Sequence, residues 1–127
     1  MATNVYSAYH LTRTLLPSMI ARRQGHIVNI CSIASLQAYQ YGGAYSVSKF
    51  ALLGFTRNLR QDMRPHQIKV TAVFPGATWT PSWEGTGVEP GRIMEAGDIA
   101  RMVYAATQLS PQATVEDIIM RPQLGDL

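Results

Sequence analysis

The stretch His-Ile-Val-Asn-Ile-Cys-Ser at residues 26–32 is a short β-branched run followed at once by a hydroxyl side chain. Such a run is typical of a buried strand in a parallel sheet. A second run, Ile-Lys-Val-Thr-Ala-Val-Phe at residues 68–74, is stopped by Pro75-Gly76 and predicts another strand. Ser32 would therefore emerge at the carboxyl edge of the sheet, where open α/β sheets bind ligands.

Helical periodicity surrounds the first of these strands. Apolar residues recur at helical spacing from about 3 to 23, and Gln24-Gly25 is expected to end this helix. Pro17 lies inside it and predicts a kink or a weakened turn. A second helix is predicted over residues 44–63, ending before Pro65.

The last third of the chain repeats this alternation. Residues 77–95 are rich in Gly and Pro and predict an irregular segment. We expect a third helix over about 99–109 with Asp98 as its cap, then a short strand over 115–120. The order αβαβαβ predicts an α/β fold, with parallel strands and helices on both faces of the sheet.

Composition restricts the class of protein. The 127 residues allow a single domain, and the net charge of +3 comes from scattered arginines typical of solvated helix faces. We therefore expect neither a nucleic-acid partner nor a membrane partner, since no apolar stretch approaches the ~18 residues of a span. A lone Cys31 fits a reducing cytoplasm, and polar residues interrupt any signal-peptide pattern: Thr3, Asn4, Ser7 and His10.

Tyr45 and Lys49 are four positions apart on the second predicted helix, so they share one face. A nearby ammonium favours the phenolate, which lowers the pKa of a phenol from about 10 and allows acid–base chemistry near neutrality. Alternatively, the two are solvated neighbours, because one such spacing arises by chance in roughly one sequence in ten of this composition. The pair alone is weak evidence.

Ser32 has two interpretations. Its hydroxyl could hydrogen-bond a substrate oxygen at the carboxyl edge, or it could cap local backbone as many loop serines do. A Ser-Lys hydrolase pairing of Ser32 with Lys49 is a third possibility, but nothing resembling such a motif surrounds Ser32.

Four segments together resemble the short-chain dehydrogenase/reductase family. They are Asn4, Asn-Ile-Cys-Ser-Ile-Ala-Ser at 29–35, Ala-Tyr-Ser-Val-Ser-Lys at 44–49 and Val-Phe-Pro-Gly-Ala-Thr-Trp-Thr at 73–80. Ser32 lies twenty-eight positions after Asn4 and thirteen before Tyr45. These intervals are similar to those of the family's Asn-Ser-Tyr-Lys catalytic set, and the resemblance covers essentially the whole chain.

The resemblance implies NAD(P)-dependent oxidoreduction of a carbonyl/alcohol pair in a small molecule. Tyr45 would be the general acid–base, and Ser32 would orient and polarise the substrate oxygen. Lys49 would bind the nicotinamide ribose and lower the pKa of Tyr45, while Asn4 would position a water that links Lys49 to solvent. The cofactor would supply the hydride.

The resemblance also implies further cofactor contacts. Pro75 and Gly76 would shape the turn beside the nicotinamide, with the Thr78 backbone and the Thr80 hydroxyl near its carboxamide or the phosphates. The sequence does not choose between NAD and NADP. A complete member of the family would also form a homo-oligomer through the helices near 3–23 and 44–63.

One departure from the family is large. The Gly-x-Gly-x-x-Gly turn that follows a strand in this family has no counterpart here. In the cluster at 85–91, Pro90 stands at the position of the third glycine, and the cluster follows a loop where the motif needs a strand. We therefore expect residues 1–127 to form a partial Rossmann-type, doubly wound parallel sheet, the carboxyl-terminal catalytic half, with the amino-terminal half absent. Such a chain would be inactive alone. The alternative is a non-catalytic remnant or an assembly partner of full-length subunits.

The remaining candidate residues give weaker evidence for a function. His10, His26 and His66 lack metal-ligand spacing, so we predict no metal site and structural or exposed histidines. Trp79 and Trp83 lie where the family has its substrate lid. They could line a substrate pocket or pack within the lid.

Overall fold

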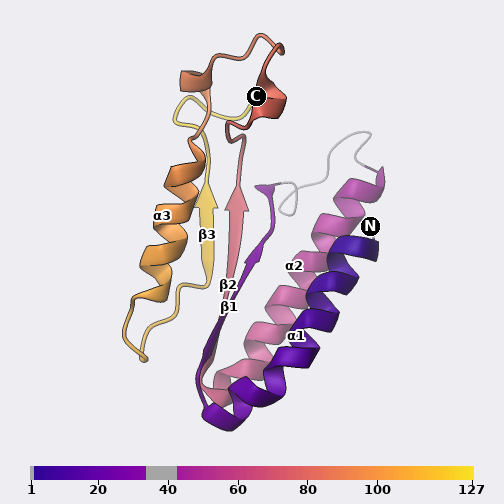
Figure 1. Ribbon diagram of the computed structural model, residues 1–127, viewed down its shortest axis with the longest axis vertical. Helices are drawn as coiled ribbons and strands as arrows, with labels where there is room; N and C mark the ends of the chain where they lie inside the picture. Colours follow the sequence, from indigo (N-terminus) through magenta and orange to yellow (C-terminus); the bar gives the residue numbers. More distant parts are fainter. Residues whose placement is uncertain (1, 34–42) are drawn as a thin grey trace.

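The computed structural model describes the backbone of residues 2–33 and 43–127, and the side chains of residues 6–33 and 47–127. Its main elements are α1 (Ala2–Arg22), β1 (Gly25–Ile30), α2 (Gly43–Met63), β2 (Ile68–Pro75), α3 (Ala96–Thr107) and β3 (Asp117–Met120), arranged as in Figure 1. This order confirms the predicted αβαβαβ alternation. Short 3-10 turns lie at Arg64–His66, Pro81–Trp83 and Pro90–Arg92, the last two inside the segment predicted to be irregular.

The three strands form one parallel sheet in the order β1-β2-β3. The central strand β2 is buried almost throughout, as its apolar sequence predicts. The prediction of a buried strand is wrong for β1, which is half-buried and leaves the Ile30 side chain 51% exposed. The reason is its place at the edge, because within the described residues β1 pairs only with β2.

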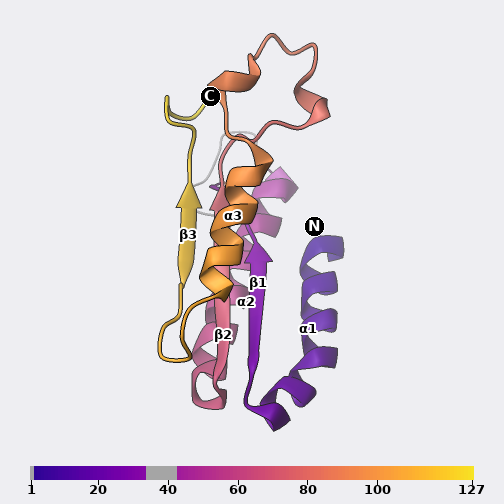
Figure 2. The same ribbon diagram turned by 60° about the vertical axis from the view of Figure 1, so that its left-hand side comes forward.

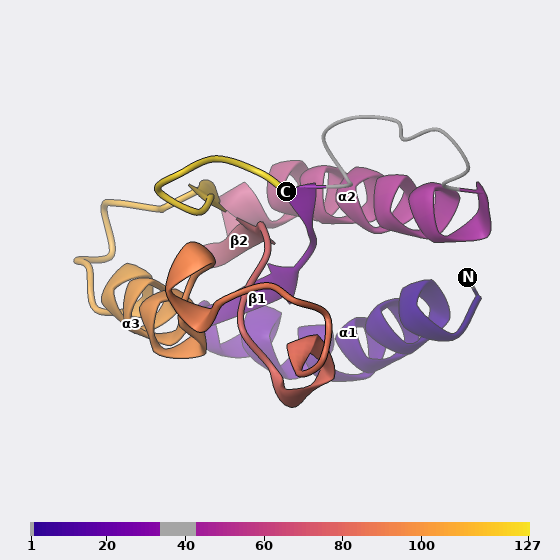
Figure 3. The same cartoon turned by 90° about the horizontal axis from the view of Figure 1, so that it is seen from above.

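Helices cover both faces of the sheet. Successive side chains of a strand point to opposite faces, so alternate residues of β2 serve two cores. Val70 and Phe74 pack toward α1 and α2, whereas Val73 packs against Ala106 of α3 and Ile118 of β3. Figures 2 and 3 show α1 and α2 together on one side of the sheet and α3 on the other. The doubly wound α/β class is thereby confirmed.

Two helix ends differ from the sequence prediction. Helix α1 runs through Pro17 and ends at Arg22, near the predicted end, but the left-handed residue that follows it is Arg23, with φ 52°, rather than Gly25. Arg23 N–H donates to Ile20 O and Gln24 N–H to Met19 O, the hydrogen-bond pair of a Schellman cap with arginine where glycine is usual. Gly25 already belongs to β1.

Helix α3 begins at Ala96, three residues earlier than predicted, so Asp98 is not its cap. The Asp98 carboxylate instead accepts from the Glu95 backbone N–H at 3.3 Å, as the third residue of a capping box does. The final strand is also shorter than predicted, beginning at Asp117.

One buried cation fixes α2 against the sheet. Arg60 is buried, and its Nε donates to Val70 O at 3.1 Å while Nη2 donates to Asp117 Oδ1 at 2.9 Å. A buried guanidinium is stable only when its charge and donors are matched, and these contacts match them.

No helix in the described ranges is both long and apolar enough to cross a membrane.

Candidate active site

The residues predicted to carry chemistry gather at the carboxyl edge of the sheet. Ser32 lies two positions beyond the end of β1, and the Cys31 N–H just before it donates to Val73 O at 2.7 Å. Gly76 follows directly on the last residue of β2. Because the two strands are parallel and adjacent, Ser32 and Gly76 leave the sheet at the same edge.

Lys49 of α2 lies at this edge as well. Burial raises the pKa of the Cys31 thiol, and the positive charge of Lys49 partly offsets that effect. Leu53, one turn beyond Lys49 on the same helix, belongs to the same core cluster as Cys31, which brings this part of α2 to the edge. Lys49 is half-buried and close to the residue that immediately precedes Ser32.

A hydrogen-bond chain that the sequence analysis did not single out holds β1 against α2. Asn29 Nδ2 donates to Thr56 Oγ1 at 2.9 Å, and Thr56 Oγ1 donates to Leu52 O at 2.7 Å. Thr56 is fully buried and seven positions after Lys49, two turns along the same helix. That spacing, a hydroxyl on the lysine's face of the helix, is the signal that could have identified Thr56 as a positioning residue.

Asn4 and Tyr45 occupy the first turns of α1 and α2. Their side chains lie outside the described residues, so only their backbone positions can be compared. Both helices start at the end of the molecule toward which the strand arrows point (Figures 1 and 2). Position 45 precedes Lys49 by one helical turn, so all four predicted catalytic positions fall at one end of the fold.

The turn after β2 is closely packed. The Gly76 N–H donates to Met120 O at 2.8 Å, and a Cβ at position 76 would lie 3.3 Å from that oxygen and 3.3 Å from Cδ of Pro122. A side chain here would force the chain after β3 to shift by a few tenths of an ångström, so glycine fits this close approach best. Pro75, the last residue of β2, pairs with Met120 across the sheet.

Thr78 and Thr80 differ in what their hydroxyls do. Thr78 Oγ1 donates to Gly76 O at 2.9 Å and so braces the turn, whereas Thr80 Oγ1 is exposed and lies 2.6 Å from Ser82 Oγ. Thr78 also forms a parallel bridge with Met94, which brings the segment before α3 beside the end of β2.

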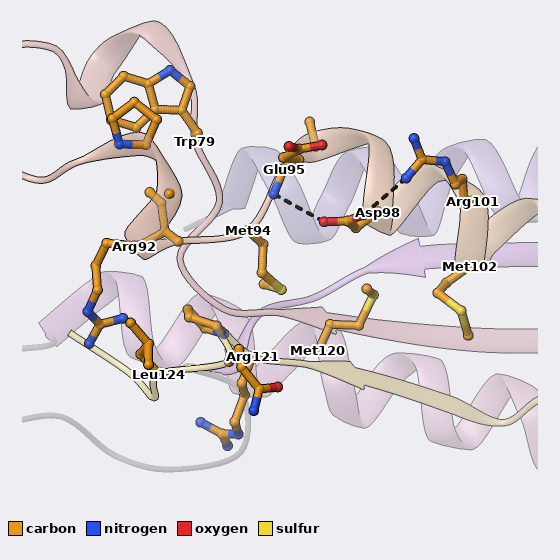
Figure 4. A pocket seen from close by; sticks show the side chains of 16 residues that line it. Trp79, Arg92, Met94, Glu95, Asp98, Arg101, Met102, Met120, Arg121 and Leu124 are labelled. Atoms are coloured by element: carbon orange, nitrogen blue, oxygen red, sulfur yellow. Dashed lines mark hydrogen bonds and ion pairs between the residues drawn. The ribbon is translucent and has the colours of Figure 1, made fainter.

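An open cleft of about 1050 Å³ adjoins this turn. Figure 4 shows its labelled walls, drawn from the segment between β2 and α3, from α3 and from the end of β3: Trp79, Arg92, Met94, Glu95, Asp98, Arg101, Met102, Met120, Arg121 and Leu124. Trp79 thus faces a cleft, as one of the two interpretations of the tryptophans predicted, while Trp83 does not line it. Ser32 and Lys49 are not among its lining residues.

The cleft's charged groups are engaged in local contacts. Arg92 Nη1 donates to Gly125 O at 2.8 Å, Arg101 pairs with Asp98 at 3.1 Å, and Arg121 pairs with Asp126. The lining groups left for a ligand to contact are therefore mainly the indole of Trp79 and the methionine thioethers, which favour an apolar ligand.

Within the described residues, no group of three His, Cys, Asp or Glu side chains could hold a metal ion. His10 is exposed, and His26 is half-buried and hydrogen-bonded to Thr71. Both follow the prediction of exposed or structural histidines.

Comparison with known sequences gives a coherent set of relatives. A family model described as short chain dehydrogenase matches residues 1–89. The whole chain is 34% identical to sepiapterin reductase of Chlorobaculum tepidum, covering 52% of that protein. Over 60% of its length, the chain is 45% identical to dehydrogenase/reductase SDR family member 7B of Xenopus tropicalis, covering 25% of that protein.

Solved structures give the same result. Serine dehydrogenase from Escherichia coli superposes with a TM-score of 0.83 at 27% identity, over 98% of this chain and 52% of that one. A metagenomic short-chain oxidoreductase in complex with NADP superposes with a TM-score of 0.74 at 32% identity, over 94% and 48% respectively. The chain spans about half the length of the relatives first matched. On this fold and this family match, the chain belongs to the short-chain dehydrogenase family.

Proposed function

We propose that residues 1–127 form the catalytic half of an NAD(P)-dependent oxidoreductase that interconverts a carbonyl compound and an alcohol. The observation that supports this most is the convergence at one sheet edge of Ser32, Lys49 and the turn at 75–80. Membership of an oxidoreductase family adds the reaction class.

The proposed chemistry divides among four positions. Lys49 would lower the pKa of the Tyr45 phenol through its charge, and the phenol would donate a proton to the carbonyl oxygen in reduction or accept one in oxidation. Ser32 would hydrogen-bond the same oxygen and fix its orientation. Asn4 would hold a water that relays protons between Lys49 and solvent.

The residues present fit the nicotinamide end of the cofactor. The half-buried Lys49 ammonium can donate to ribose hydroxyls, the exposed Thr80 hydroxyl can donate to a phosphate, and the Thr78 backbone can contact the carboxamide beside Pro75 and Gly76. When bound, the nicotinamide supplies or accepts the hydride. A solved relative contains NADP, which supports NADP or the closely similar NAD as the group bound here.

The oligomeric part of the proposal rests on α1 and α2. Their outer surfaces carry exposed apolar side chains, and an apolar groove of about 510 Å³ runs between the two helices. The exposed residues are Tyr6, Tyr9, Val47 and Phe50. An exposed apolar surface of this kind marks a protein interface, here between copies of the chain.

A second candidate function is that of a non-catalytic partner that assembles with full-length subunits. The outer edge of β1 favours it, because within the described residues that edge has no partner strand and its backbone groups can template pairing with another chain. The two functions differ in whether the site at Ser32 and Lys49 turns over substrate.

A chimera separates them. In it, this chain replaces the matching part of the Chlorobaculum tepidum relative, and the other half of that protein is retained. Oxidation of NADPH and NADH is then followed with a panel of ketones and aldehydes. The catalytic proposal predicts turnover dependent on the carbonyl compound. A folded chimera that binds NADPH, judged by nicotinamide fluorescence, but turns over no substrate would support the non-catalytic partner.

A further inference from the structure

A second cleft lies at the opposite end of the sheet from Ser32. Its volume is about 470 Å³, and it is lined where α1 and α3 end and where β1 and β2 begin. Figure 1 shows these segment ends together at the end of the molecule away from the strand arrowheads. The charged and polar lining includes Arg22, Arg23, His26, Gln67 and Lys69.

This amino-edge cleft carries positive charge without a matching negative one. Three of its lining residues are the cations Arg22, Arg23 and Lys69, and none of its lining residues is a carboxylate. The ion pairs found among the described residues use other cations. The side chains that line the cleft therefore carry a net positive charge at neutral pH, which the carbonyl ends of α1 and α3 offset only in part.

The hydrogen bonds of these cations orient them without neutralising them. Lys69 Nζ donates to Ser110 O at 2.7 Å, Arg22 Nε to Ser18 O at 3.3 Å and Arg23 Nη2 to Pro65 O at 3.4 Å. All three acceptors are uncharged backbone carbonyls. Each guanidinium has five donors, so most remain available to a ligand.

The backbone of the cleft is in an unfavourable conformation at two positions. Arg23 with φ 52° and Gln67 with φ 63° are the non-glycine residues with positive φ in the described part of the chain, and both line this cleft. Left-handed backbone costs free energy for any residue other than glycine, and such costs cluster at binding sites.

We propose that the amino-edge cleft binds a small molecule bearing a phosphate group. Two guanidiniums and one ammonium supply positive charge, and their N–H groups can donate to the oxygens of a doubly charged phosphate. The cleft is separate from the candidate active site, so this ligand is distinct from the substrate and from the nicotinamide end of the cofactor. The residue with left-handed backbone that follows α1, Arg23, is part of the cleft wall.

The probe is inorganic pyrophosphate, titrated calorimetrically at constant ionic strength into the chimera saturated with NADPH, because the 127-residue chain alone is expected to self-associate. The informative variant is Arg23→Gly, because glycine prefers the backbone conformation found there. We expect this variant to unfold at a higher temperature than wild type while binding pyrophosphate about tenfold more weakly, as loss of one charge-assisted contact implies. A purely structural Arg23 would not give opposite changes in stability and affinity.

Two further variants complete the test. Lys69→Gln should also weaken pyrophosphate binding about tenfold without touching α1. Arg13→Gln is the matched control, since Arg13 is an exposed arginine of the same helix that donates to Tyr9 Oη and lies outside the cleft. The proposal is overturned if wild type binds no pyrophosphate at millimolar concentration, if Arg23→Gly binds it as wild type does, or if Arg13→Gln weakens binding equally.

Discussion

His26 Nε2 lies 2.7 Å from Thr71 Oγ1, and that hydroxyl donates to Val115 O at 2.7 Å. A threonine hydroxyl has one hydrogen, and the carbonyl of Val115 accepts it. His26 Nε2 therefore carries a hydrogen and donates to Thr71. This chain of two hydrogen bonds links β1 to β2 and β2 to the segment that enters β3, on the face covered by α3.

The protonation of His26 should make stability depend on pH. Burial, and secondarily the charge of Lys69, lower the pKa of His26 below 6.5. The unfolded chain then binds more protons than the native one as pH falls through 6.5, so the free energy of unfolding should fall with it. Urea unfolding at a series of pH values measures this.

The control for that experiment is His26→Gln, whose amide can still donate to Thr71 but does not titrate. It should lose the part of the pH dependence that begins near 6.5. An equal slope in wild type and His26→Gln would show that another group is responsible.

The second prediction concerns Arg60. Arg60→Ala removes the hydrogen bonds of a buried guanidinium to Val70 O and Asp117 Oδ1 and leaves the buried Val70 carbonyl without that donor, so it should lower the free energy of unfolding by about 3 kcal/mol. Arg57→Ala is the matched control, since Arg57 pairs with the same Asp117 at 3.8 Å but its side chain is 52% exposed, against 10% for Arg60. It should cost under about 1 kcal/mol. Comparable losses in the two variants by urea unfolding would contradict the assignment.

The third prediction concerns the 127-residue chain alone. Within the described ranges the outer edge of β1 has no partner strand, and the sequence holds no glycine-rich turn after a strand, so we expect self-association and negligible binding of NADH or NADPH. Light scattering reports the mass and nicotinamide fluorescence the affinity. A monodisperse monomer that binds either cofactor at micromolar concentration would mean that another part of the chain forms a phosphate site for it.

Much of the fold was predictable because its signals are local. The run at 68–74 ends at Pro75-Gly76, and the helix before it ends ahead of Pro65, so both boundaries come from residues that restrict their own backbone. The carboxyl-edge positions of Ser32 and Gly76 follow from the parallel order of the strands.

The errors arose where tertiary contacts outweigh local preference. Gly25 is a better left-handed cap than Arg23 by intrinsic preference, yet the chain turns one pair of residues earlier so that Gly25 can join β1. A Cβ at Gly25 would lie 2.8 Å from Sδ of Met19, a contact between separate elements that sequence spacing does not reveal. Likewise the half exposure of β1 depends on its position in the sheet and not on its composition.

The fourth prediction separates the two roles proposed for Lys49. Lys49→Arg keeps the positive charge but replaces a compact ammonium with a planar fork that cannot occupy the same half-buried position beside Cys31. In the active chimera we expect kcat/KM to fall by about 10²-fold or more, together with weaker NADPH binding. Near-normal kinetics would reduce Lys49 to a solvated neighbour of Tyr45. Arg57→Lys, on the exposed side of the same helix, should leave turnover unchanged.

The central claim is that Tyr45 is the acid–base of a carbonyl reductase site built on this edge of the sheet. Tyr45→Phe removes one hydroxyl and little volume, so the fold and the cofactor affinity of the chimera should be retained. The decisive measurement is kcat for carbonyl reduction by wild-type and Tyr45→Phe chimeras, with NADPH affinity measured alongside. We expect kcat to fall by at least about 10²-fold in Tyr45→Phe while the affinity for NADPH is unchanged. A Tyr45→Phe chimera that turns over within a few-fold of wild type would contradict it.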